Sequence, residues 1–185
     1  NLTHDDKYLE LCRDILKKGV KKDDRTNTGT LSLFGTQLIF DISETVPLLT
    51  TKNVPWKIVI EELLWFLRGD SDAKILQEKG VKIWDGNSSR EFLDSRGLYN
   101  YDEGVLGPMY GWNFRFFGAP YSQALSDTST CDTRKIGGFD QLDYVINEIK
   151  NNPSSRRILI SLWNPLDFKK VSLMCCHYSI QFNVR

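Results

Sequence analysis

The sequence predicts an α+β fold in one domain. Stretches with an apolar residue every three or four positions, typical of helices, are interspersed with short runs in which every second residue is apolar. The connections between the expected strands do not follow a regular strand–helix–strand order, which argues against a doubly wound parallel sheet. No internal repeat, low-complexity tract or linker divides the chain, so we expect residues 1–185 to form a single domain.

The first expected element is an amphipathic helix over residues 8–16, with Gly19 placed where a C-terminal cap belongs. A polar turn follows at residues 24–30. Two strand segments are then expected, over residues 31–33 and 38–42, with a bend at Gly35 between them. Arg25 in the turn reads by default as a solvated side chain. A guanidinium beside free backbone amides would instead suit an anion.

The next expected helix covers residues 56–67 and is apolar on nearly every side, which predicts burial on most of its surface. Glu61 and Glu62 lie in its middle. A carboxylate in such a setting is costly unless it is hydrogen-bonded or used in chemistry, so one of the two is a candidate functional group. The alternative places both on a solvent edge.

The remaining elements are short, apart from one clear helix near the end. A glycine-punctuated turn at residues 106–112 carries aromatic side chains that suit either packing or the wall of a site for a planar ligand. Residues 118–137 are expected to form an exposed loop. Helices are expected at 73–79, 91–95 and 139–149, and strands at 81–83 and 158–163.

Residues 173–182 alternate like a strand and contain the pair Cys176-His177. A thiol is a strong nucleophile when a cationic environment holds it as thiolate. The plainer reading is that cysteine is a small buried hydrophobe, and a Cys-His pair alone does not decide between the two. Alternation along the strand would turn Cys175 to the opposite face from Cys176.

The composition excludes several classes. With 24 basic and 24 acidic side chains the net charge is zero, which does not suggest a DNA-binding or other general polyanion-binding protein. No apolar run is long enough to span a membrane. The four cysteines include no Cys-x-x-Cys pattern, so we expect reduced thiols and a cytoplasmic location. The two histidines lack metal-ligand spacing with the cysteines, so we expect no metal site.

Taken together, the motifs resemble the thymidylate synthase family. They include Asp-Arg-Thr at 24–26, Gly-Pro-Met-Tyr-Gly at 107–111 and Arg-Arg-Ile at 156–158. The resemblance runs in order through nearly all 185 residues, and its other motifs lie at 47–52, 61–66, 83–85, 140–141, 163–164, 176–177 and 181–182.

The resemblance implies a fold and an activity. The fold is a mixed β-sheet with flanking helices, with one sheet face packing in a homodimer. The activity is reductive methylation of dUMP to dTMP. Methylenetetrahydrofolate supplies both the carbon and the hydride and leaves as dihydrofolate, so neither nicotinamide nor metal is needed.

The resemblance also assigns roles to positions of this chain. Cys176 is implied as the nucleophile that adds to carbon six of the pyrimidine. Glu62 is implied in proton transfer through ordered water, and Tyr110 lies beside the nucleophile. Gln181 and Asn113 are implied as amides that order the nucleotide pocket, although the family usually has glutamine at the second position.

The remaining roles concern the phosphate and the folate. Arg25 is implied to bind the nucleotide phosphate of its own subunit, whereas Arg156 and Arg157 reach the phosphate of the partner subunit. For the folate, Ile83 and Trp84 are implied as an apolar wall, and Lys52 as the lysine near the glutamate tail.

The chain departs from the family in other places as well. Met174 and Cys175 stand where two prolines are usual, and Asn27 stands where a glycine is usual. The family's last third is missing from the sequence, including the asparagine that specifies the base, so we expect a piece of a longer chain. A dihydrofolate reductase domain preceding Asn1 is left open.

Two alternatives to thymidylate synthase stay open at this point. One is a dUMP or dCMP hydroxymethylase of the same fold, and the other is a non-catalytic truncated fragment. An unrelated thiol hydrolase is disfavoured because no second histidine is placed to serve as its base.

Overall fold

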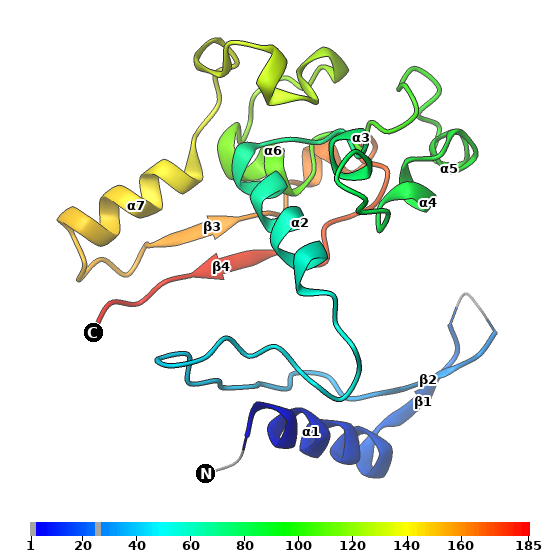
Figure 1. Ribbon diagram of the computed structural model, residues 1–185, viewed down its shortest axis with the longest axis vertical. Helices are drawn as coiled ribbons and strands as arrows, with labels where there is room; N and C mark the ends of the chain where they lie inside the picture. The colour runs from blue at the N-terminus through cyan, green and yellow to red at the C-terminus, as the bar shows by residue number, and fades with distance from the viewer. Residues whose placement is uncertain (1–2, 25–26) are drawn as a thin grey trace. The chain divides into compact units, whose positions relative to one another are not determined.

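The computed structural model describes residues 3–24 and 27–185 of the chain. The chain forms two compact units, Asn1–Trp56 and Lys57–Arg185. Helices and strands are interspersed in it, as the sequence predicts (Figure 1). No helix among the described residues combines the length and the apolar character needed to cross a membrane.

The first unit begins with helix α1 (His4–Lys18), which has defined ends. Thr3 and Asp6 form a capping box, in which the Thr3 hydroxyl accepts from the Asp6 N–H at 3.1 Å and the Asp6 carboxylate accepts from the Thr3 N–H at 3.0 Å. At the other end the Gly19 N–H donates to the Ile15 carbonyl at 2.8 Å. A Cβ at Gly19 would lie 2.4 Å from that oxygen, so the cap requires glycine. Both the helix and its capping glycine are as predicted.

Strands β1 (Val20–Lys22) and β2 (Thr30–Ser32) follow as an antiparallel pair. The turn between them depends on Asp24, whose carboxylate accepts from the N–H groups of Thr28 and Gly29, each at 3.1 Å. Asn27 has a φ of 57°, in the left-handed region that glycine and asparagine tolerate best. This conformation accounts for an asparagine at a position where the family usually has glycine.

The rest of the first unit is extended chain without assigned strands. The strand expected at residues 38–42 is therefore not found, since no described segment pairs with it. Side chains of α1 hold this extended chain instead: Lys7 donates to the Ile39 carbonyl at 2.7 Å, and Asp5 accepts from the Thr50 N–H at 2.8 Å. None of the described residues in this unit is buried.

The second unit carries most of the secondary structure and all of the buried core. Its elements are α2 (Trp56–Arg68), α3 (Lys74–Gln77), α4 (Asp85–Ser88), α5 (Arg90–Ser95), α6 (Tyr110–Arg115), α7 (Gln141–Asn151), β3 (Leu159–Ser161) and β4 (Ser179–Gln181), with short 3-10 turns at Gln123–Leu125, Thr128–Thr130, Thr133–Lys135 and Pro165–Asp167. α2 begins at the last residue of the first unit. Figure 1 shows α7 running alongside β3.

The core joins α2, α6, α7 and β3, with Trp65, Tyr110, Val145 and Ile160 among its buried members. The Gln141 side chain fastens three of these elements together. Its amide nitrogen donates to the carbonyl of Asn113 at 2.6 Å and to that of Ser161 at 2.7 Å, while its oxygen accepts from the Ser161 N–H at 2.9 Å. These bonds fix α6, α7 and the end of β3 against one another.

Strands β3 and β4 pair antiparallel, with Ile160 opposite Ile180. Ile160 is buried, whereas Leu159 and Gln181 on the opposite face are exposed. Within residues 3–24 and 27–185 the strands make two separate two-stranded antiparallel sheets. A single mixed sheet is therefore not seen in this part of the chain.

Several predicted elements are found and others are wrong. The helices expected at 73–79, 91–95 and 139–149 correspond to α3, α5 and α7. The strand expected at 81–83 is absent, because Val81 is buried without a strand partner and a turn leads into α4. The glycine-rich turn expected at 106–112 instead gives way to α6 at Tyr110.

The expected burial of α2 is also wrong in this structure. Trp65 and Phe66 are buried, but a broad apolar face of the helix, including Val59, Leu63 and Leu64, is exposed. An apolar residue at almost every position of the helix does not indicate which side is covered.

Candidate active site

Cys176 lies in an irregular segment just before β4, held in place by Tyr110 at the start of α6. The Tyr110 hydroxyl oxygen accepts from the backbone N–H of Cys176 at 2.7 Å and from that of His177 at 3.4 Å. Burial raises the pKa of Tyr110, and the two N–H donors oppose that shift. The phenol stays protonated at neutral pH. No described residue accepts its proton, which leaves it available to a ligand.

The neighbouring cysteines have opposite environments. The Cys176 side chain is exposed, whereas Cys175 is buried in the core. Desolvation raises the pKa of Cys175 to about 12, so its thiol stays protonated and is a poor nucleophile. The separation of the two side chains is as predicted, but its cause differs: the segment is irregular here, and strand pairing begins only at Ser179.

Beside this segment is a pocket of about 360 Å³ between α2, α6 and β4. Its wall is mostly apolar, and its polar groups are few: Glu62 from α2, Tyr110 from α6, and His177 and Ser179 next to or within β4. The rings of Tyr110 and His177 lie 5.4 Å apart. A mainly apolar pocket with a few converging polar groups is typical of a small-molecule site.

The structure separates the two candidate carboxylates. Glu61 forms an ion pair with Lys79 at 2.6 Å, and this hydrogen bond lowers its pKa. Glu62 faces the pocket and accepts from the Trp84 indole N–H at 2.8 Å. No described residue donates to the second oxygen of Glu62, so the carboxylate has one oriented oxygen and one free for water or ligand. Geometry therefore favours Glu62 as the functional group.

The two predicted amides lie outside this pocket. Asn113 is buried, and its amide nitrogen donates to the carbonyls of Pro108 at 3.4 Å and Leu162 at 3.1 Å. It is placed to brace α6 against the end of β3. Gln181 is exposed on β4 and does not line the pocket.

Arg156 and Arg157, two of the predicted phosphate-binding arginines, do not line the pocket beside Cys176. Arg156 and Arg157 are exposed in the turn before β3, and no described side chain reaches either guanidinium. Arg25 lies outside the described residues. Lys52, predicted near the folate tail, is exposed in the first unit.

The two residues predicted to form the folate wall differ in how much of their surface is exposed. Ile83 is 46% exposed and presents a free apolar surface, while Trp84 is 9% exposed and its N–H is committed to Glu62. The bond from Trp84 to Glu62 links the wall to the candidate proton-transfer group. Sequence reasoning named both residues but not their contact.

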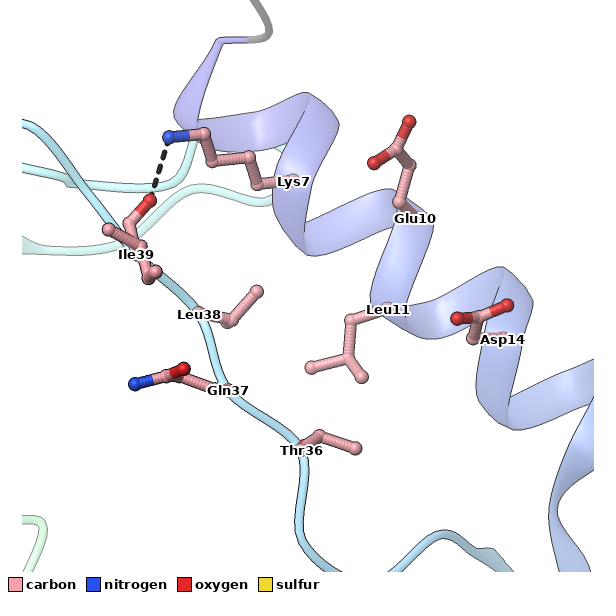
Figure 2. A pocket seen from close by; sticks show the side chains of 8 residues that line it. All are labelled: Lys7, Glu10, Leu11, Asp14, Thr36, Gln37, Leu38 and Ile39. Carbon is pink, nitrogen blue, oxygen red and sulfur yellow. Dashed lines mark hydrogen bonds between the residues drawn. The ribbon is translucent and has the colours of Figure 1, made fainter.

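A second cavity, of about 460 Å³, lies in the first unit between α1 and residues 36–39 (Figure 2). Lys7, Glu10 and Asp14 project from the helix around Leu11 and Leu38. None of the predicted site residues lines this cavity. Among the described residues, no cluster of three or more His, Cys, Asp or Glu side chains is placed to hold a metal ion.

The exposed Cys176 thiol thus projects from a segment whose backbone is hydrogen-bonded to a buried phenol, beside a pocket with one oriented carboxylate. An accessible thiol on a fixed backbone is what nucleophilic catalysis by cysteine requires. The family model described as thymidylate synthase matches residues 6–185. The chain therefore belongs to the thymidylate synthase family.

Named relatives agree with this membership. The chain is 54% identical over 178 residues to a putative bifunctional dihydrofolate reductase-thymidylate synthase of Oryza sativa subsp. japonica, covering 96% of this chain and 35% of that protein. It is 54% identical over 177 residues to the bifunctional enzyme of Zea mays, covering 96% of this chain and 33% of that protein. It is also 54% identical over 185 residues to a thymidylate synthase of Candida albicans, covering 98% of this chain and 56% of that protein. The chain thus spans about a third of the bifunctional relatives and just over half of the third protein.

Sequence reasoning missed two structural groups of the site. Gln141 was part of a family motif but had no assigned role, and it proves to fasten α6, α7 and β3. Ser179 lines the pocket from β4. The sequence alone could not have placed Ser179 in the pocket, because its position depends on how β4 pairs with β3.

Proposed function

We propose that this chain supplies the nucleotide and folate site of a thymidylate synthase, which converts dUMP to dTMP with methylenetetrahydrofolate. The observation that carries the proposal is the Tyr110 hydroxyl. It fixes the backbone of Cys176 and His177 beside a pocket into which Glu62 projects. Membership of the family supports the reaction, and the exposed Cys176 supports the assignment of the nucleophile.

In the proposed mechanism the Cys176 thiolate attacks carbon six of the uracil ring, which makes carbon five nucleophilic. Carbon five bonds to the methylene of methylenetetrahydrofolate and then loses its proton as the bond from the methylene to the folate breaks. The tetrahydrofolate released in this step gives a hydride to the methylene and leaves as dihydrofolate. Glu62, with one oxygen held by Trp84, orders water and moves protons at the pyrimidine. The Tyr110 phenol orients the nucleophile's segment and offers its proton to the nucleotide. Elimination of Cys176 releases dTMP.

The residues assigned to the folate fit an extended ring system in part. Ile83 presents free apolar surface, while the buried Trp84 next to it in sequence orients Glu62 through its indole N–H. We propose Lys52, exposed in the first unit, as a contact for the anionic tail, and Gln181 and Asn113 as ordering groups. Gln181 would act on the nucleotide directly, and Asn113 by bracing α6.

We further propose a homodimer that packs through the exposed face of β3 and β4, within a larger mixed sheet. Arg156 and Arg157 would then bind the phosphate of the partner's nucleotide, and Arg25 that of its own subunit. Both arginines of the pair are exposed and have no described partner, as expected of groups that act on another chain. Reduced cysteines support a cytoplasmic location.

Product analysis tests the reaction. The full-length protein is incubated with dUMP and methylenetetrahydrofolate. The nucleotide and folate products are then separated, and mass spectrometry identifies and quantifies them. Formation of dTMP and dihydrofolate in equal amounts is expected. A hydroxymethylated nucleotide with tetrahydrofolate would identify a hydroxymethylase instead. The absence of any product would favour a non-catalytic role.

Complementation tests the arginines. Two inactive proteins, Cys176→Ala and the double variant Arg156→Ala/Arg157→Ala, are unfolded together and refolded. About half of the dimers are mixed, each with one complete site of two, so roughly a quarter of wild-type activity returns. Activity no greater than the sum of separately refolded controls, with mixed dimers shown to be present, would exclude arginines donated in trans.

A further inference from the structure

The side chains of Arg156 and Arg157 receive no support of their own from this chain. Both are exposed, and no described side chain lies within hydrogen-bonding or ion-pair distance of either guanidinium. Their direction therefore depends on the backbone of the turn from which they project. A guanidinium that binds a phosphate through two parallel hydrogen bonds needs a backbone that is held in one position.

The backbone at Arg157 is held by three hydrogen bonds. Its N–H donates to the Ser155 hydroxyl at 3.2 Å, and its carbonyl accepts from the Leu159 N–H at 3.0 Å. The same carbonyl accepts from the Tyr144 hydroxyl at 3.0 Å. The first two bonds are local to the turn. Of these three bonds, only the one from Tyr144 reaches another element, α7. The residues on either side of the arginine pair are held separately: the Ser155 N–H donates to the Asn152 carbonyl at 3.0 Å, and the Ile158 carbonyl accepts from the Phe182 N–H at 2.8 Å.

Tyr144 is itself firmly placed. Its ring packs against the core, and its centroid lies 5.6 Å from that of Phe139. It projects from the first half of α7, a helix that is fastened to β3 through Gln141. The hydrogen bond from the Tyr144 hydroxyl therefore restrains the Arg157 carbonyl relative to α7.

We propose that Tyr144 is a positioning residue for the arginine pair: its hydroxyl sets the Arg157 backbone so that both guanidinium groups are presented to the phosphate of the partner's nucleotide. This inference rests on the proposed function. Tyr144 touches neither substrate nor reacting atoms, so its removal should weaken nucleotide capture and leave the chemical step unchanged.

The first test is Tyr144→Phe in the full-length protein, which deletes one hydroxyl and keeps the ring. Loss of one hydrogen bond predicts a rise of about fivefold in the KM for dUMP, with kcat within twofold of wild type. Tyr101→Phe is the matched control, because the Tyr101 hydroxyl also donates to a backbone carbonyl, that of Lys170, at 2.9 Å. It should leave the KM for dUMP unchanged. A loss of kcat in Tyr144→Phe without a change in KM, or equal KM changes in the two variants, would overturn the inference.

Mixed dimers test where the effect acts. In a mixture of Cys176→Ala with Arg156→Ala/Arg157→Ala, the one complete site takes its arginines from the Cys176→Ala chain. Adding Tyr144→Phe to that chain should raise the KM for dUMP about fivefold. Adding it to the chain without arginines should change nothing, because there it has no arginines to position.

The outcomes separate this inference from the proposed function beneath it. If both placements of Tyr144→Phe raise KM equally, Tyr144 has a general structural role and the inference fails while the trans arginines stand. If the mixture regains no activity, or if Arg156→Ala/Arg157→Ala binds dUMP as tightly as wild type, the proposed role of the arginines fails, and the inference falls with it.

Discussion

Replacing Glu62 by glutamine should damage turnover far more than nucleotide binding. Glutamine has nearly the same shape and keeps an oxygen to accept from the Trp84 indole, a bond of 2.8 Å in the structure. The pocket should therefore stay intact. What is lost is a carboxylate that can take up and return protons, and general acid–base groups typically contribute a hundredfold or more in rate. We expect kcat to fall about a hundredfold, equivalent to about 2.7 kcal/mol in the activation free energy.

Glu61→Gln is the matched control on the same helix. Glu61 forms an ion pair with Lys79 and does not line the pocket, so kcat should stay within a few-fold of wild type. The assay is steady-state dihydrofolate formation for both variants, together with dUMP affinity measured by equilibrium dialysis. Equal losses of kcat in the two variants would refute the assignment of Glu62, as would a Glu62→Gln defect confined to dUMP affinity.

Two further predictions concern the scaffold of the site, and chemical denaturation measures both. Gln141→Leu should lower the unfolding free energy by about 3 kcal/mol or more, because it removes the hydrogen-bond partner of the buried Asn113 carbonyl and of the partly buried N–H and carbonyl groups of Ser161. A loss below about 1 kcal/mol would contradict this role. Gly69→Ala should lower the unfolding free energy more than Gly80→Ala. Both glycines have positive φ, so both substitutions strain the backbone. A Cβ at Gly69 would in addition lie 2.6 Å from the Phe116 ring, whereas a Cβ at Gly80 would meet nothing within 4 Å. Equal losses would show that backbone strain alone matters at both positions.

The elements predicted best from the sequence are those whose apolar pattern is long. α7 shows a clear helical period, and its pattern predicts the face that buries Val145. α2 is slightly longer than α7, but it is apolar around most of its circumference. The apolar pattern therefore predicted that residues 56–67 form a helix, but it did not predict which face of the helix is exposed. That face depends on which elements pack against α2.

Short alternating patterns were less informative. Residues 38–42 and 81–83 alternate as strands do, yet neither segment has a described partner strand, and strand structure requires pairing. The opposite error occurred at Tyr110, where glycine punctuation suggested only a turn and the chain instead enters α6. Here the tertiary packing around Tyr110 overrides local turn preference.

For the site, the sequence named the groups but not their contacts. Cys176, Tyr110 and Glu62 were identified through family motifs. The bond from the Cys176 N–H to the Tyr110 hydroxyl joins residues far apart in the chain, and the Trp84–Glu62 bond joins different elements. Such contacts follow from the fold and carry no periodic signature in the sequence.

Covalent capture of the nucleotide tests the central claim most directly. The full-length protein is incubated with a fluorinated dUMP analogue and methylenetetrahydrofolate, and its intact mass is measured. Cys175→Ala serves as the matched control, since the buried Cys175 thiol has a raised pKa and should not react. We predict an adduct in the wild type and in Cys175→Ala, and none in Cys176→Ala. An adduct that survives Cys176→Ala would contradict the assignment of Cys176 as the nucleophile.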